Sequence, residues 1–154
     1  MSQISDFIGK FNTSMSLDQD LIVKKDDRYF LLDPKLKSLI KKDFLYAGIY
    51  LGRTKNDAFF PSFSLLTMLA QTDPNRIVVD NKTEWLFICG RDIFKQGITR
   101  LSKPGRKGDY TLILTEHGDS LGFGRILHYV DTKDKSKIAV KNIADIGDFL
   151  RRER

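Results

Sequence analysis

Residues 84–100 read E-W-L-F-I-C-G-R-D-I-F-K-Q-G-I-T-R, and residues 121–125 read L-G-F-G-R. In both stretches apolar residues bury one side, glycines mark the turns, and an arginine or lysine repeatedly follows the glycine. Short apolar runs separated by glycine are typical of the strands of a small β-barrel or sandwich. The pattern predicts a rigid β-fold that presents a basic surface to an anionic ligand, and it does not resemble a catalytic pocket.

Positive charge is concentrated around the first of these stretches. The formal net charge is +6, and in residues 76–154 Lys and Arg outnumber Asp and Glu by sixteen to eleven. Between residues 91 and 107 the basic residues face only Asp92, and they are Arg91, Lys95, Arg100, Lys103, Arg106 and Lys107. A basic cluster on one structural unit favours nucleic-acid binding through phosphate contacts, with a solvated charged face as the alternative. Trp85, Phe87 and Tyr110 lie near this cluster, where core packing is favoured over base stacking.

The first half of the chain predicts an α/β domain with a small, mostly antiparallel sheet. Apolar residues recur at helical spacing over residues 3–12, and Ser2 is placed to cap that helix. Asp33-Pro34 begins a second helix over residues 34–42, with three residues facing inward: Leu36, Leu39 and Ile40. Strands are expected at 21–23, 29–32, 44–51 (ending at Gly52) and 58–60, and a helix capped by Ser62 or Ser64 runs to Ala70.

Four turn-forming residues, Thr72 to Asn75, mark a boundary between residues 1–74 and 75–154. Beyond it, strands are expected at 76–80, 85–89, 110–115, 121–130 and 137–140, with a helical turn at 92–96. Gly122 and Gly124 lie inside one of these strands, where close backbone approach or a bulge at a barrel corner explains them. The fold class is therefore α+β, with an α/β domain followed by a small β-barrel.

Several functional classes are disfavoured by residue content. Cys89 is the only cysteine, so cysteine metal clusters and internal disulfides are excluded, and its apolar neighbours predict a buried side chain. His117 and His128 have no metal-ligand spacing, and no cofactor motif is present. The chain start lacks the pattern of a signal peptide and no apolar stretch is long enough for a membrane helix, so a cytoplasmic protein is expected.

The segment from Trp85 to Arg100 resembles the opening of a PUA domain, the RNA-binding module named for pseudouridine synthases and archaeosine transglycosylases. Residues 121–125 resemble a later strand of that module, and residues 144–151, A-D-I-G-D-F-L-R, resemble the ending of one subfamily. That subfamily is the Nip-seven family of large-ribosomal-subunit biogenesis factors, which place an α/β domain before a C-terminal PUA domain. Residues 44–53, F-L-Y-A-G-I-Y-L-G-R, and the helix ending at Ala70 also fit it.

The resemblance implies a non-catalytic monomer that binds uridine-rich single-stranded RNA and acts in pre-ribosomal RNA processing. It also implies contacts with other assembly factors and with the RNA-degrading exosome. The RNA-binding set then extends beyond residues 91–107 to Arg125, Lys133, Lys135, Lys137 and Lys141. Two alternatives remain: an adaptor that binds an acidic partner within an RNA-processing or RNA-modification complex, and an RNA-modifying enzyme or its subunit. The second is disfavoured because residues 1–75 are short and contain no histidine or cysteine.

Overall fold

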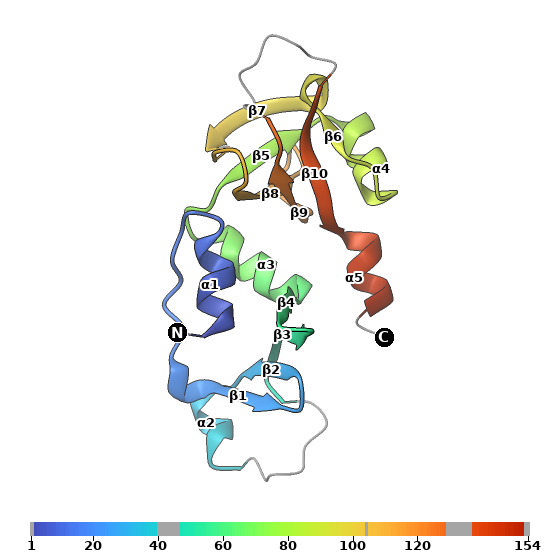
Figure 1. The fold of residues 1–154 in the computed structure, drawn as a ribbon. Coiled ribbons are helices and arrows are strands. Elements are labelled where there is room, and N and C mark those ends of the chain that lie inside the picture. The colour runs from blue at the N-terminus through green and yellow to red at the C-terminus, as the bar shows by residue number, and fades with distance from the viewer. Residues whose placement is uncertain (1, 40–46, 104, 129–136, 153–154) are drawn as a thin grey trace.

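The computed structural model describes residues 2–39, 47–103, 105–128 and 137–152. The chain forms a four-stranded sheet in its first half and a six-stranded, nearly closed barrel in its second half, arranged one above the other (Figure 1). This α+β architecture is the one that the sequence predicts.

The first half is an antiparallel meander with short helices around it. Its strands are β1 (Ile22–Lys25), β2 (Arg28–Leu31), β3 (Ile49–Lys55) and β4 (Ala58–Pro61), in the order β1-β2-β3-β4. Its helical segments are α1 (Gln3–Gly9), η1 (Gln19–Leu21), α2 (Pro34–Lys37) and α3 (Phe63–Ala70). Two expected caps are confirmed, because the Ser5 N–H donates to Ser2 Oγ and the Leu65 N–H donates to Ser62 Oγ.

Two expectations for this half are wrong. Helix α2 is a single turn, and Leu36 and Leu39 do not face inward: Leu39 is 71% exposed, while Ile40 lies outside the described residues. Strand β3 does not end at Gly52 but continues to Lys55, and residues 44–46 also lie outside the described part. Gly52 is required within the strand because its φ is +138° and a Cβ there would lie 2.3 Å from the Phe60 carbonyl oxygen.

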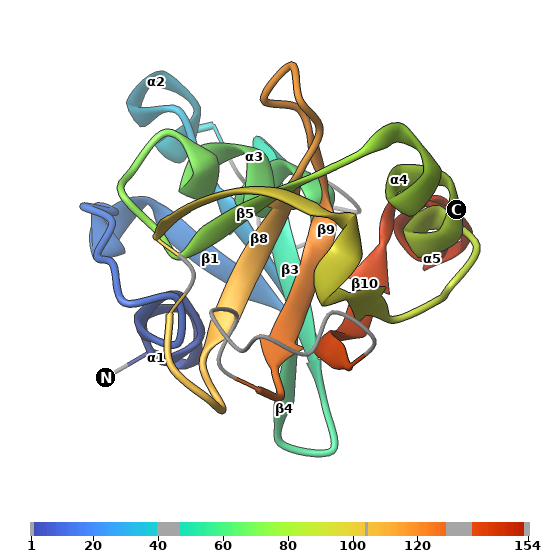
Figure 2. The same cartoon turned by 90° about the horizontal axis from the view of Figure 1, so that it is seen from above.

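The second half is the barrel. Its strands are β5 (Arg76–Val79), β6 (Ile93–Phe94), β7 (Ile98–Lys103), β8 (Tyr110–Leu114), β9 (Ser120–Ile126) and β10 (Ile138–Asp145), in the order β6-β10-β9-β8-β5-β7. Its helical segments are α4 (Asn81–Ile88), η2 (Lys95–Gly97) and α5 (Ile146–Arg152). Only the β5–β8 pair is parallel among the described pairs. Seen from above, β8 and β9 cross the middle of the molecule with α1 on one side and α4 and α5 on the other (Figure 2).

The predicted strand at residues 85–89 is wrong, because this segment belongs to helix α4 and its C-cap. Asp80 starts the helix by accepting a hydrogen bond from the Thr83 N–H at 2.7 Å. Only one side of the apolar run then faces the barrel core: Phe87 is fully buried, whereas Trp85 is 69% exposed. Cys89 is exposed as well, which corrects the expectation of a buried thiol.

Gly122 and Gly124 mark the closest approach of two strands, as the sequence predicts. A Cβ at Gly122, whose φ is +141°, would lie 2.1 Å from the Ala144 carbonyl oxygen. A Cβ at Gly124 would lie 2.5 Å from the Lys141 carbonyl oxygen. Strand β10 also carries a register shift between Asn142 and Ala144. Small residues at this bulge therefore let β9 and β10 bend together into the barrel wall.

Helix α1 joins the two halves through one hydrophobic core. Phe7 of this helix and Phe11, two residues beyond its end, are buried in the same cluster as Leu112 and Phe123 of the barrel. The ring centroids of Phe7 and Phe123 are 5.5 Å apart, and those of Phe11 and Tyr110 are 5.6 Å apart, both in edge-to-face geometry. Such aromatic pairs each add about 0.5–1.5 kcal/mol beyond the area that they bury. The helix therefore anchors the meander to the barrel. A second cluster, which includes Ile77, Phe87 and Val140, fills the barrel itself.

A polar junction fixes the same contact at the C-terminal end of α1. Asn75 is buried; its backbone N–H donates to the Phe11 carbonyl oxygen at 2.8 Å, and its Nδ2 donates to the Tyr110 carbonyl oxygen at 2.9 Å. Asn12 Nδ2 donates to Asp109 Oδ2 at 2.7 Å. Asn75 thus bonds backbone groups on both sides of the junction, and the amide of Asn12 adds a bond to a carboxylate of the barrel.

Replacing Asn75 with Ala removes the donor to the buried Tyr110 carbonyl. We expect the free energy of unfolding to fall by about 2–3 kcal/mol, since an unsatisfied buried acceptor and a small cavity remain. Urea denaturation measures this change. The exposed Asn81 provides a matched control, and Asn81→Ala should change the value by less than about 0.5 kcal/mol. Equal stability of both variants would show that the junction does not hold the halves together.

Candidate nucleic-acid interface

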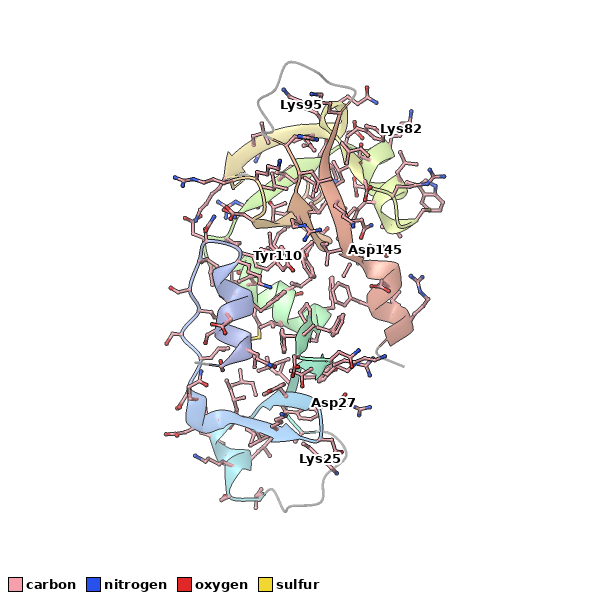
Figure 3. All side chains as sticks on the ribbon, viewed as in Figure 1. Lys25, Asp27, Lys82, Lys95, Tyr110 and Asp145 are labelled. Atoms are coloured by element: carbon pink, nitrogen blue, oxygen red, sulfur yellow. The ribbon has the colours of Figure 1, made fainter. Side chains whose placement is uncertain are left out.

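The structure distributes the expected basic residues over several parts of the barrel. Lys95 lies in η2, and its backbone N–H donates to the Lys137 carbonyl oxygen at 3.1 Å, so these two lysines are neighbours. Figure 3 shows Lys95 at the end of the barrel that is farthest from the meander. Arg91 follows α4, and Arg100 lies on the edge strand β7; both are exposed. Lys133 and Lys135 lie outside the described residues.

Lys103 has a structural role at the junction. Its ammonium group forms an ion pair with Asp73 Oδ2 at 3.3 Å and donates to the carbonyl oxygens of Asn12 and Asp73. Three oxygen partners use all three donors of an ammonium group. Lys103 therefore ties the end of β7 to the turn before β5, and it is poorly placed to contact a phosphate as well.

A second basic group follows the outer face of the sheet. Arg125 on β9 lies directly opposite Tyr110 on β8 and Lys141 on β10. Directly opposed residues share one face of a sheet, so the three side chains form a row across adjacent strands. Arg106 and Lys107 are exposed in the loop before β8, and the Gly108 N–H donates to the Ile126 carbonyl oxygen at 2.8 Å. This loop therefore lies at the end of β9 next to Arg125.

Helix α4 presents an exposed aromatic residue, Trp85, in a segment that was predicted as a strand. Trp85 is 69% exposed and Lys82 precedes it by three residues, which puts both on one face of the helix. Leu86 and Phe94 are exposed too, and both line a hollow of about 310 Å³ between α4, β6 and η2. The Arg91 N–H donates to the Leu86 carbonyl oxygen. The carboxylates of Asp80 and Asp92 line the same hollow. We use the name α4–β6 surface for six residues of α4 and of the segment that follows it: Lys82, Trp85, Leu86, Arg91, Phe94 and Lys95.

The turn between α4 and β6 is held by Asn142 on β10. Asn142 Nδ2 donates to the carbonyl oxygens of Phe87 at 2.9 Å and Arg91 at 3.3 Å, and the Asn142 N–H donates to Asp92 Oδ1 at 2.9 Å. The carboxylates of Asp92 and Asp80 both accept from backbone N–H groups. These hydrogen bonds hold the backbone of the turn that carries Arg91, which favours binding because little backbone entropy is lost on docking.

The α4–β6 surface combines exposed π-faces with basic side chains. Such a surface suits a single-stranded nucleic acid, because every base has a face for stacking and every nucleotide carries a phosphate. The signal for it in the sequence was the capping pattern from Asp80 to Glu84, which begins a helix. His117 and His128 are exposed. Within the described residues no group of three or more His, Cys, Asp or Glu is placed to hold a metal ion, and no described helix is long and apolar enough to cross a membrane.

Comparisons with known proteins agree with this reading of the barrel. The family model described as UPF0113 PUA domain matches residues 75–154. A protein of Archaeoglobus fulgidus called UPF0113 protein is 31% identical over 112 residues, which cover 71% of this chain and 63% of that protein. The match thus spans less than two thirds of that relative's length. The 60S ribosome subunit biogenesis protein NIP7 homolog of Dictyostelium discoideum is 23% identical, over 96% of this chain and 88% of its own. The homolog of the same name from Danio rerio is 28% identical, over 83% and 76%.

Solved structures show the same fold over the whole chain. A conserved PUA domain protein from Thermoplasma acidophilum superposes with a TM-score of 0.62 at 19% identity, covering 99% of this chain and 96% of that one. A hypothetical protein from Pyrococcus horikoshii OT3 gives 0.59 at 16% identity with the same coverage. At these identities the likeness concerns the fold alone. Together with the family match and the relatives of the NIP7 name, which confirm the resemblance found in the sequence, it shows that the chain belongs to the UPF0113 PUA domain family.

Proposed function

We propose that this protein is a non-catalytic factor in the assembly of the large ribosomal subunit that binds uridine-rich single-stranded pre-ribosomal RNA. The observation that carries the proposal is the α4–β6 surface, where Trp85 and Phe94 are exposed beside Lys82, Arg91 and Lys95. The names of two relatives, both 60S ribosome subunit biogenesis proteins, support the ribosomal context.

Binding at this surface divides into two contributions. Stacking of a base on an aromatic ring contributes about 1–3 kcal/mol and tolerates any base. Basic side chains add phosphate contacts, whose strength falls as salt rises. Uracil has the smallest stacking area of the bases, so we attribute the preference for uridine to backbone flexibility, which lets an unstacked strand follow the curved barrel.

The remaining parts of the proposal concern the meander and its partners. Residues 1–74 act as a unit that orients the barrel and contacts other assembly factors, with the exosome among the candidates. Exposed apolar residues of the meander support a protein contact: Leu39 is 71% exposed, Ile49 44% and Leu36 40%. We place this activity in the cytoplasm.

Replacing Trp85 with Ala tests the stacking contribution. We expect the dissociation constant for a fluorescein-labelled U12 RNA to rise by about 5- to 100-fold, which corresponds to the loss of one stacked base. Fluorescence anisotropy at fixed salt measures it. Leu39→Ala removes an equally exposed apolar side chain of the meander, in the other half of the molecule, and should leave the affinity unchanged. An unchanged affinity in Trp85→Ala would contradict binding of the RNA at helix α4.

Replacing Arg91, Lys95 and Arg100 together with Ala tests the phosphate contacts. The slope of log K against log salt concentration should become shallower by about 2, since each contact with single-stranded RNA contributes about 0.7. The matched control removes three exposed lysines of the meander, Lys35, Lys37 and Lys55. A slope that changes equally in both variants would indicate a diffuse charge effect and contradict a defined site.

A further inference from the structure

A second pocket lies between helix α1 and the outer face of the barrel, on a different side from the α4–β6 surface. It has a volume of about 400 Å³. Helix α1 covers it, strand β4 forms one wall, and the sheet forms its floor. Figure 3 shows Tyr110 between the barrel strands and α1, at this position. The residues that matter to the argument are Gln3, Asp6, Lys10, Phe59, Tyr110 and Phe123. We call this pocket the α1 groove, and its volume falls within the range of small-ligand sites.

The aromatic side of the α1 groove is rigid. Tyr110 packs edge-to-face against Phe7 at 6.0 Å and Phe11 at 5.6 Å, and it is tilted against Phe123 at 5.3 Å. These contacts fix the ring without burying it fully, because Tyr110 is only half-buried. The Lys10 ammonium lies over one face of the ring, 5.0 Å from its centroid. A base that stacks on this face would take the place of the Lys10 side chain.

A basic row lies beside the groove: Tyr110, which lines it, is followed on the neighbouring strands by Arg125 and Lys141, while the charged residues of the lining itself are Asp6, Lys10 and Asp57. Phe123 precedes Arg125 by two residues on β9 and lines the groove, so Arg125 lies on the same face of the sheet. Neighbouring strands are about 4.8 Å apart, which puts Arg125 one strand and Lys141 two strands from Tyr110. Arg125 and Lys141 are thus the basic residues that follow Tyr110 along this row, and they are the candidates for a phosphate contact beside the groove.

The opposite side of the groove offers hydrogen-bond acceptors. Gln3 Oε1 is buried and has no hydrogen-bond partner within the described part of the chain. Buried acceptors without partners are rare in folded proteins, and rotation of the half-buried Gln3 side chain would turn this acceptor into the groove that it lines. Asp6, one turn further along α1, adds a carboxylate to the same lining. Two acceptors side by side match the N–H donors of a nucleobase edge or the hydroxyls of a ribose.

We propose that the α1 groove binds one unpaired nucleotide. The base stacks on Tyr110, donor groups of the nucleotide bind Gln3 Oε1 and Asp6, and the phosphate contacts Arg125 and Lys141. The inference extends the proposed RNA binding, since the groove would hold a second position of the same strand. It also explains why the basic row on β9 and β10 is separated from the α4–β6 surface.

Three variants test the groove in the full chain. Gln3→Met keeps the side-chain length and removes the unpartnered acceptor, so the fold should be at least as stable. We expect it to weaken binding of U12 RNA by about 3- to 10-fold, the effect of one lost hydrogen bond. Arg125→Ala combined with Lys141→Ala should weaken it by about 10- to 50-fold. The exposed pair Lys35→Ala and Lys37→Ala is the control and should bind like the unchanged protein. Thermal unfolding of each variant verifies the fold.

Two probes distinguish an RNA nucleotide from a free one. Photocrosslinking of 4-thiouridine-substituted U12 followed by peptide mapping should label the segment around Tyr110. Titration with uridine or adenosine 5′-monophosphate, followed by amide NMR shifts at Gln3 and Tyr110, shows whether a free nucleotide also binds. RNA binding with normal affinity in both groove variants and no crosslink near Tyr110 would overturn the groove inference and leave the proposed function intact. Absence of any RNA binding by the unchanged protein would refute the proposed function, and the nucleotide titration would then decide for or against the groove.

Discussion

The contact of helix α1 with the barrel is the interaction on which the rest of the structure depends. Phe7 and Phe11 place two rings between the meander and the outer face of β8 and β9, where they meet Tyr110 and Phe123. Without this helix the outer face of the barrel sheet would expose large apolar side chains to water. Burying these side chains stabilises the contact between the two halves by about 25 cal/mol per Å² of apolar surface. The polar junction at Asn75 then sets the orientation of one half against the other.

The same contact gives the barrel two different sides. The side that faces α1 uses its aromatic residues in packing, and at its margin it leaves the α1 groove. The opposite side, which we propose binds RNA, is formed by α4 and β6; no helix from the described part of the meander lies against it, and Trp85 remains exposed there. Asn142 and Asp92 hold this side in place through the bulge of β10. Packing on the α1 side thus stabilises the barrel, and the barrel in turn supports the α4–β6 surface on its opposite side.

Local signals in the sequence predicted most of the fold. Caps at Ser2 and Ser62, the hairpins of the meander and the paired glycines of β9 depend on short-range chemistry, and the structure confirms each of them. The strand expected at residues 85–89 failed because an apolar run of five residues has no periodicity to separate a strand from a helix. The helix forms because Asp80, five residues before Trp85, accepts a capping hydrogen bond from the Thr83 N–H.

The candidate site was less accessible from the sequence, because its parts meet only after folding. The density of Lys and Arg indicated a basic segment at residues 91–107, but in the structure its members lie in different places. Lys95 lies beside Lys137, whereas Lys103 forms an ion pair with Asp73 at the junction of the two halves. The exposure of Trp85, the residue that we propose for stacking, was not expected, because its segment was predicted as a buried strand. Tyr110 and Arg125 are fifteen positions apart and become a pair only through the β8–β9 register, which no local pattern specifies.

Trp85 is the only tryptophan of the chain, so its fluorescence reports directly on the central claim. Titration of the unchanged protein with U12 RNA should quench the indole emission, with a midpoint equal to the dissociation constant from anisotropy, and added salt should restore the emission as the RNA leaves. Stacking of a base on the exposed indole predicts this coincidence. Saturating RNA binding that leaves the emission spectrum unchanged would contradict the assignment of the α4–β6 surface as the RNA interface.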